Sequence, residues 1–213
     1  MNILGRIICV GGWTGAGKDF TCKGITKRRP SFVHVCPTLK TIAEEEGFSD
    51  VAEFQKVVSA VMDGTDKTPE HQKYKDTDKL FDEKLYDEVK STLDQGRDVV
   101  VSTWLGPWIL EKISKEKGDG LKVDFKVWLY APAVPCAERM IRGRSDAKSD
   151  IEETIRYMKE KDQNNIGRYM DVYGIDITDH SNFDIEINSI SYNGDKLVDL
   201  VLSAFDIKFG GRC

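Results

Sequence analysis

The chain has 213 residues, which fits one domain with room for a mobile insert, because domains usually contain about 100–200 residues. Hydrophobic residues make up 40% of the chain and charged residues 31%, a balance that excludes collagen-like, low-complexity and mostly disordered proteins. The formal net charge of −5 argues against general affinity for nucleic acid or acidic membranes, since both need a net basic face. A small polyanionic ligand held by a few local cations remains compatible with this charge.

The predicted elements alternate between short strands rich in β-branched residues and amphipathic helices. In chain order they are a strand at 6–10, a glycine-rich loop at 12–19, a helix at 18–27, a strand at 31–35, a long helical region at 38–96, a strand at 97–102, a strand at 123–130, a helix at 137–142, a polar segment at 143–148, a long helix from 149, a strand at 184–188 and a last helix around 197–205. This order predicts an α/β fold, in which a five-stranded parallel sheet carries helices on both faces in three layers.

Some local details accompany this assignment. Pro132 and Pro135 are expected in the turn after the fourth strand, and the sequence Ser149-Asp-Ile-Glu152 is expected to form the capping box of the long helix. The segments 38–96 and 143–148 are interpreted as excursions from a single sheet rather than as linkers between domains.

The five cysteines and three histidines show no spacing typical of a disulfide framework or a metal site. We therefore expect reduced thiols, a cytoplasmic protein and no histidine-based metal site. Residues 1–10 run directly into the glycine-rich loop and have no signal-peptide pattern, and no apolar run reaches the ~18 residues of a membrane span. We expect no membrane association.

Residues 12–19, Gly-Trp-Thr-Gly-Ala-Gly-Lys-Asp, match the G-x-x-x-x-G-K phosphate-binding loop. Its glycines let successive backbone N–H groups turn inward, Lys18 can reach the β- and γ-phosphates, and the helix that starts there adds its positive dipole end. The motif lies between a strand and a helix and predicts a P-loop NTPase fold that binds ATP. The expected nucleotide contacts are Gly12, Trp13, Thr14, Gly15, Ala16, Gly17, Lys18, Asp19 and Phe20.

Asp19 stands where the motif has Ser or Thr, whose hydroxyl helps to hold Mg²⁺. A carboxylate can hold Mg²⁺ directly or through water, although it also brings negative charge close to the phosphates. We interpret Asp19 as a metal-side residue. The alternative is a helix cap that weakens triphosphate binding.

A group of cations follows in the second half of the chain. Its members are Arg139, Arg142 and Arg144 beside the polar segment and Arg156, Lys161 and Arg168 on the next helix. Each alone is compatible with a solvated helix face, but together they favour phosphoryl transfer, which needs positive charge around the transferred group. No general base is apparent in the sequence. Its absence favours a phosphate as the acceptor, because a phosphate oxygen is already ionised.

Three segments carry a further pattern: residues 11–18 (GGWTGAGK), residues 99–108 (VVVSTWLGPW), and residues 168–177 (RYMDVYGIDI) with 181–188 (SNFDIEIN). Together they resemble the nucleoside monophosphate kinases, most closely the archaeal-type cytidylate kinases, in order over nearly the whole chain. The resemblance implies a CORE domain of residues 1–37, 97–142 and 151–213, a helical acceptor-binding insert at about 38–96, and a lid at about 143–150 that closes over ATP.

The resemblance also implies roles for individual residues in an ATP- and Mg²⁺-dependent transfer of the γ-phosphoryl group to CMP, dCMP or a related nucleotide. Lys18 and the loop amides would hold ATP and Asp19 the Mg²⁺. Arg139, Arg142 and Arg144 would be lid cations, and Lys161 and Arg168 would neutralise the transferred group. The expected acceptor contacts are Lys40, Ser102, Trp104, Trp108 and Arg156.

The chain departs from the family at several of these positions. Trp104 and Lys40 stand where the family has arginines at the acceptor side, and Lys161 replaces the arginine of an Arg-Asp pair. Lysine keeps the charge but loses the bidentate fork, whereas tryptophan loses both and can stack on a base. The sequence Gly-Lys-Asp-Phe ending at Phe20 is similar instead to phage deoxynucleotide kinases and animal-type phosphomevalonate kinases.

Two alternatives therefore stay open: a kinase of another small phosphorylated or hydroxylated metabolite, and a nucleotide-binding regulator that has lost catalysis. In each case the expected partners are small molecules and not nucleic acid, and the expected state is a monomer or a homodimer.

Overall fold

The computed structural model describes residues 5–36, 38–62, 64–143 and 150–210. The elements in chain order are β1 (Ile7–Gly12), α1 (Lys18–Arg28), β2 (Phe32–Val35), α2 (Leu39–Glu45), α3 (Val51–Met62), the 3₁₀ helix η1 (Pro69–Asp76), α4 (Thr77–Asp94), β3 (Asp98–Ser102), α5 (Gly106–Lys117), β4 (Phe125–Tyr130), α6 (Ala133–Gly143), α7 (Ile151–Tyr173), β5 (Ile185–Asn188) and α8 (Gly194–Phe209). Every predicted strand is present within a few residues of its predicted bounds.

The strands form one parallel sheet in the order β2-β3-β1-β4-β5. β1 therefore lies in the middle, with β3 on one side and β4 on the other. The glycine-rich loop leaves the carboxyl end of this central strand, which is where open parallel sheets bind ligands. The predicted α/β fold with a five-stranded parallel sheet is confirmed.

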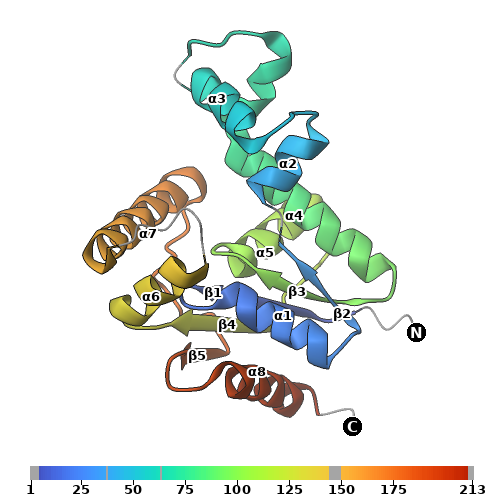
Figure 1. Cartoon of the computed structure of the whole chain (residues 1–213). Helices are drawn as coiled ribbons and strands as arrows, with labels where there is room; N and C mark the ends of the chain where they lie inside the picture. The colour runs from blue at the N-terminus through green and yellow to red at the C-terminus, as the bar shows by residue number, and fades with distance from the viewer. Residues whose placement is uncertain (1–4, 37, 63, 144–149, 211–213) are drawn as a thin grey trace.

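Side chains alternate between the two faces of β1, and each face is covered by helices. Ile8 and Val10 belong to the apolar cluster with α1 and α8, whereas Ile7 and Cys9 belong to the cluster with α4 and α5. Figure 1 shows α8 below the sheet and α4 and α5 above it. All four β1 side chains are at most 2% exposed, so the strand that leads into the loop is anchored from both sides.

A glycine permits the close packing of α1 against α8. A Cβ added at Gly24 would lie 2.5 Å from Cγ2 of Val198, which is completely buried. Since a Cβ cannot occupy that space unless the neighbouring side chain moves, the helix that follows the phosphate loop depends on this glycine for its position.

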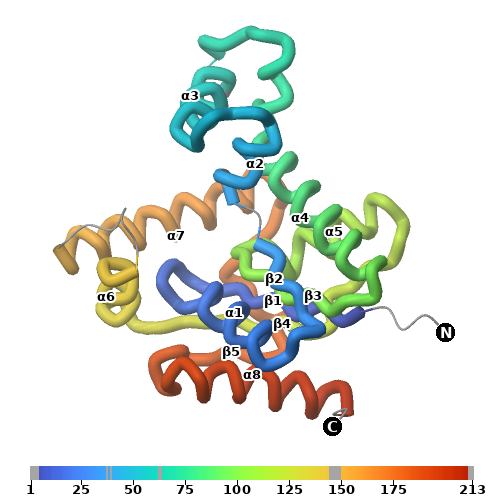
Figure 2. Tube along the Cα trace, turned by 45° about the vertical axis from the view of Figure 1, so that its right-hand side comes forward, coloured from blue at the N-terminus to red at the C-terminus, as the bar shows by residue number. Residues whose placement is uncertain are grey.

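The insert forms a small core of its own. Ile42, Phe54 and Tyr74, from α2, α3 and η1, are buried together, and the first half of α4 packs against them through Leu80 and Phe81. Figure 2 shows these helices projecting from the sheet at the top of the molecule. The second half of α4 packs onto the sheet, so this one helix joins the insert to the main core.

The structure corrects three details of the sequence interpretation. Helix α5 was not predicted. Pro135 lies in the first turn of α6 rather than in the loop before this helix. A missing backbone N–H does no harm in the first turn of a helix, because that N–H has no partner within the helix. The cap of α7 is Asp150, whose side chain accepts a hydrogen bond from the Glu153 amide, while Ser149 is outside the described residues.

Within the described ranges, no helix is both long enough and apolar enough to cross a membrane.

Candidate functional site

Three glycines, the last residue of β1 and two in the loop that follows it, adopt positive φ angles that other residues rarely take. The angles are +147° at Gly12, +78° at Gly15 and +101° at Gly17. A Cβ at Gly12 would lie 2.3 Å from the Leu129 carbonyl oxygen, and one at Gly15 would lie 2.8 Å from the Cβ of Cys136. Gly17 is also the N-cap of α1 and has no side chain to cover the first amides of the helix. The loop therefore presents backbone N–H groups, as an anion site requires.

Lys18 is folded over its own loop. Its Nζ donates hydrogen bonds to the carbonyl oxygens of Gly12 at 2.7 Å and Trp13 at 3.2 Å, and it lies 5.0 Å from the centre of the Trp104 ring. The ammonium group is thus held at the concave side of the loop, where a bound phosphate would sit.

Tryptophans surround this loop. The ring centre of Trp13 is 5.6 Å from that of Trp104 and 5.3 Å from that of Trp128, and Trp108 lies 6.4 Å from Trp128. Trp108 contacts other aromatic rings and lines neither of the two cavities described below.

The larger cavity, of about 820 Å³, lies over the phosphate loop. Of the predicted nucleotide contacts, it is lined by Thr14, Gly15, Ala16, Gly17, Lys18, Asp19 and Phe20, and of the predicted cations by Arg139 and Lys161. Tyr192, from the loop between β5 and α8, adds an aromatic ring to the lining. The lining of this cavity therefore combines cations and backbone amides with exposed aromatic rings.

Arg139 joins the phosphate loop to the loop after β5. Its guanidinium donates to the Ser189 hydroxyl at 2.9 Å and the Ser189 carbonyl at 3.2 Å, and to the Ala16 carbonyl at 3.4 Å. A planar, multidentate donor suits this bridging position. The same group borders the large cavity.

A second contact ties the loop to α7. The Thr14 hydroxyl donates to Asp162 Oδ1 at 2.6 Å. Burial raises the pKa of the Asp162 carboxyl, and the hydrogen bonds from Thr14 oppose this effect. The Lys161-Asp162 pair thus contributes one side chain to the cavity and one to the support of the loop.

Asp19 belongs to a chain of polar contacts in the wall of the larger cavity. The Ser102 hydroxyl, at the end of β3, donates to Asp19 Oδ1 at 2.8 Å and lies 2.8 Å from His34 Nε2. Cys36 Sγ lies 3.4 Å from the Ser102 carbonyl oxygen. Among the described residues, the ligand atoms of Asp19, His34 and Cys36 all lie within 4.8 Å of one another. Burial lowers the pKa of His34 and raises that of the Cys36 thiol.

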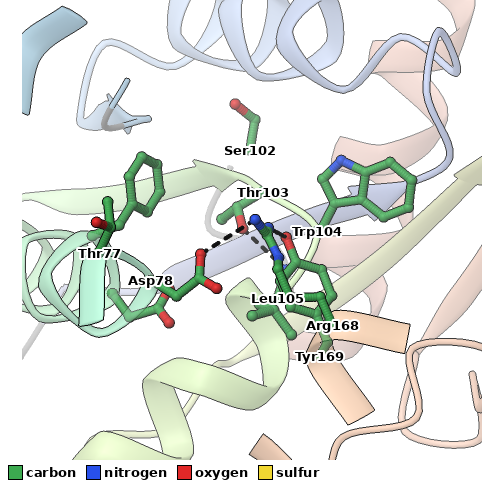
Figure 3. Close-up of a pocket in the computed structure, with 10 residues that line it drawn as sticks. Thr77, Asp78, Ser102, Thr103, Trp104, Leu105, Arg168 and Tyr169 are labelled. Atoms are coloured by element: carbon green, nitrogen blue, oxygen red, sulfur yellow. Dashed lines mark hydrogen bonds and ion pairs between the residues drawn. The ribbon is translucent and has the colours of Figure 1, made fainter. Parts of the chain in front are cut away.

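A smaller cavity of about 270 Å³ opens between α4, α7 and the residues that follow β3. Ser102, Thr103 and Trp104 line both cavities, so the two meet beside the phosphate loop. Figure 3 shows Arg168 between Asp78 and the ring of Tyr169. Arg168 Nη1 lies 3.4 Å from Asp78 Oδ1, and Nη2 donates to the Tyr169 hydroxyl at 3.1 Å.

Asp82 is a buried carboxyl in the wall of this smaller cavity. It accepts a short hydrogen bond from the Tyr173 hydroxyl. Its pKa is raised to about 7, mainly by burial and to a lesser extent by Asp78, while the Tyr173 bond and Arg168 lower it. The carboxyl can therefore exchange a proton near neutral pH.

The structure brings some predicted site residues together and separates others. Lys40 is exposed on α2, 3.7 Å from Glu44, and Arg156 is exposed on α7. Arg142 donates to the Glu138 carbonyl of its own helix. In the part of the chain that the structure describes, none of these three lines either cavity. Arg144 and most of the predicted lid fall outside the described residues.

Sequence reasoning missed two carboxyls of the smaller cavity and two members of the polar cluster around Ser102. Asp78 and Asp82 are spaced four apart on α4, which places them on one face, but nothing local indicates that this face meets α7. His34 and Cys36 are two apart at the end of a strand and so point to one side. Asp19 joins them only because β2 and α1 are neighbours in the fold.

The chain is similar to known kinases over most of its length. The model of the cytidylate kinase-like family matches residues 7–191. The cytidylate kinases of Thermococcus kodakarensis and Methanocaldococcus jannaschii are 26% and 28% identical over 202 residues, which is 94% of this chain and 88% and 97% of those proteins. The crystal structure of an uncharacterised protein from Eubacterium ventriosum has a TM-score of 0.59 at 14% identity, with coverages of 95% and 98%, and supports the fold alone. These findings confirm the predicted resemblance and the phosphotransferase class.

Proposed function

The chain belongs to the cytidylate kinase-like family, and we propose that it transfers the γ-phosphoryl group of ATP to a nucleoside monophosphate, with CMP or dCMP as the first candidates. One observation carries this proposal: a donor-type cavity over the phosphate loop and a second cavity share the wall formed by Ser102, Thr103 and Trp104. Direct phosphoryl transfer requires two substrates bound side by side at such a junction.

On the donor side, the loop amides and Lys18 would hold the phosphates of ATP. Arg139 and Lys161 border the same cavity and would balance the charge that develops during transfer. Phe20 and Tyr192 offer partly exposed rings for the nucleotide base, being 56% and 41% exposed. Arg142 and Arg144 remain proposed lid cations, because closure of the lid is what would bring them to the phosphates.

The residues beside Lys18 fit a hydrated Mg²⁺ ion. In most P-loop proteins a hydroxyl follows the loop lysine, and an aspartate at the end of a neighbouring strand supplies the second oxygen. This chain has the two groups exchanged, since Asp19 follows Lys18 and Ser102 ends β3, and they are 2.8 Å apart. Both supply the hard oxygens that Mg²⁺ prefers. Bound there, Mg²⁺ would neutralise charge on the β- and γ-phosphates.

On the acceptor side, the smaller cavity offers groups that match an aminopyrimidine. A carboxylate such as Asp78 can accept a hydrogen bond from the exocyclic amine of cytosine, whereas uracil presents a carbonyl oxygen at that position. Arg168 supplies donors beside it, and Trp104 and Phe81 offer aromatic surface. This combination supports cytosine over uracil. Lys40, Trp108 and Arg156 lie away from this cavity and would reach the acceptor only after a rearrangement.

A second candidate acceptor is a hydroxyl group. Among the described residues that line the smaller cavity, Arg168 is the one cation, and two carboxyls are present. A hydroxyl acceptor needs a positioned carboxylate to take its proton, and Asp78 or Asp82 supplies one that the sequence did not reveal. This observation is the reason to keep a sugar- or polyol-like acceptor as the second candidate.

An acceptor panel tests both candidates. ADP release from Mg·ATP is measured with CMP, dCMP, UMP, dUMP, dTMP, AMP and GMP, and with a parallel set of small hydroxylated metabolites. CMP- or dCMP-dependent release that Lys18→Ala abolishes supports the proposal, and Asp78→Asn should then reduce the preference for CMP over UMP. Turnover only with hydroxylated metabolites would replace the proposal by the second candidate. ATP binding without acceptor-dependent release from either set would refute both.

A cytoplasmic location and a monomeric or homodimeric state stay predictions. Gel filtration with light scattering of the purified chain tests the latter.

A further inference from the structure

Three side chains with different donor atoms meet where the ends of β2 and β3 lie beside the first turn of α1. Asp19 comes from the first turn of α1, His34 from β2, and Cys36 from the residue just past the end of β2. One carboxylate oxygen, one ring nitrogen and one sulfur lie within 4.8 Å of one another. The three residues come from two elements that the fold packs together, and they converge on a single small volume.

The contacts around Ser102 show where that volume lies. Its hydroxyl donates to Asp19 Oδ1 at 2.8 Å and lies 2.8 Å from His34 Nε2, and Cys36 Sγ is 3.4 Å from its carbonyl oxygen. The donor atoms of the three side chains therefore all face the end of β3. His34 and Cys36 are half-buried, whereas Asp19 is exposed and borders the large cavity. The cluster is therefore partly covered by protein at His34 and Cys36 and is open to the larger cavity at Asp19.

The donor set is not the one that Mg²⁺ selects. Mg²⁺ takes oxygen ligands almost exclusively, while imidazole and thiolate suit Zn²⁺ and its neighbours among the transition metals. Three protein ligands with a remaining position open to solvent are typical of accessible zinc sites. One thiolate and one carboxylate also balance the charge of a divalent ion.

We propose that Asp19, His34 and Cys36 bind one divalent transition-metal ion of the Zn²⁺ class, at a site that shares Asp19 with the nucleotide cavity. The site is independent of the identity of the phosphoryl acceptor and of turnover. This metal site is not part of the phosphate-loop motif. It combines Asp19, which stands where the motif has Ser or Thr, with His34 of β2 and Cys36 just after β2.

Cobalt titration of the full chain tests this proposal, because Co²⁺ replaces Zn²⁺ and absorbs light. Metal-free protein in a thiol-free reductant is titrated with Co²⁺, and absorption is followed in the visible and near-ultraviolet. The expected result is one ion per chain with a thiolate-to-cobalt charge-transfer band. Zn²⁺ at equal concentration should remove the band, and a large excess of Mg²⁺ should leave it in place.

Variants assign the ligands. Cys36→Ser should abolish the charge-transfer band, whereas Cys136→Ser, which removes a buried thiol outside the cluster, should keep it. His34→Gln should keep the thiolate band but weaken Co²⁺ binding by about tenfold or more. Circular dichroism confirms that each variant is folded. If Cys36→Ser does not fold, His34→Gln and Asp19→Asn carry the test through altered visible-band intensity and affinity.

A charge-transfer band that persists in folded Cys36→Ser, or a titration without any thiolate band, would overturn the proposal and leave a hydrogen-bonded polar cluster. Unaltered Co²⁺ affinity in both His34→Gln and Asp19→Asn would overturn it as well. None of these measurements uses ATP or an acceptor. A failed acceptor panel and a failed metal titration are therefore separate results.

Discussion

Replacing Asp82 by asparagine should stabilise the protein at alkaline pH, because ionisation of this carboxyl in the folded state is unfavourable. Asp82 is 6% exposed, and burial, with a further contribution from Asp78, raises its pKa from 3.8 to about 7 against the opposing effects of Tyr173 and Arg168. Asparagine keeps an oxygen that can accept the Tyr173 hydroxyl and carries no charge at any pH.

The magnitude follows from proton linkage. The folded protein binds the Asp82 proton more tightly than the unfolded chain does, so this group favours folding at low pH. That contribution is lost as the pH rises from the unfolded-state pKa of 3.8 to the folded-state value of about 7. With 1.36 kcal/mol per pKa unit, the wild-type protein should lose roughly 2–3 kcal/mol of unfolding free energy through this group between about pH 5 and pH 8. For a chain of this size that equals a shift in Tm of about 5–10 °C.

Urea unfolding at these two pH values measures the effect. The free energy of unfolding of Asp82→Asn relative to wild type should rise by about 2–3 kcal/mol from the lower pH to the higher. Asp94→Asn is the matched control, because Asp94 lies exposed at the far end of the same helix, and it should follow the wild type. An offset between Asp82→Asn and wild type that is the same at both pH values would refute the reasoning.

Substitutions at three further positions test the phosphate loop and its support. Lys18→Ala should lower kcat by roughly 10²–10³-fold in the ADP-release assay, since it removes a cation aimed at the transferred phosphate; Lys18→Ala with normal turnover would contradict the donor site. Gly24→Ala should destabilise the fold by about 1–3 kcal/mol in urea, because its Cβ would press on Val198, and an unchanged midpoint would show that α1 and α8 can separate freely. Thr14→Val should destabilise by about 1–3 kcal/mol by leaving the Asp162 carboxylate without its hydroxyl partner, whereas Thr14→Ser should retain most of the stability.

The sheet and the phosphate loop could be predicted because their signals are local. Each strand is a short segment rich in β-branched or aromatic residues between turns, and the alternation of strands with helices predicts a parallel sheet. The loop is a single stretch in which Gly12, Gly15 and Gly17 are required by the backbone itself. Nothing distant in the chain had to be known.

The acceptor side could not be predicted to the same depth, for physical reasons. Asp78 and Asp82 lie on a polar helix, α4, which faces α7. Because α4 ends at Asp94 and α7 begins only at Ile151, the position of these carboxyls in the wall of the smaller cavity depends on tertiary packing and not on the local sequence. Helix α5 was missed because residues 99–108 were interpreted as a strand and turn, although Pro107 suits the first turn of a helix. The sequence predicts Trp104 as an acceptor contact. Its position in the wall shared by the two cavities could not be predicted, because it depends on where β3 ends in the folded sheet.

The arrangement of the aromatic rings has a practical consequence. The chain contains four tryptophans, and Trp13, Trp104, Trp108 and Trp128 form one contiguous group around the phosphate loop. Because Trp13 belongs to the loop and Trp104 borders both cavities, the tryptophan fluorescence of the protein originates beside the two proposed substrate cavities. The chain thus carries a built-in optical probe, with which donor and acceptor binding can each be followed in the unlabelled protein.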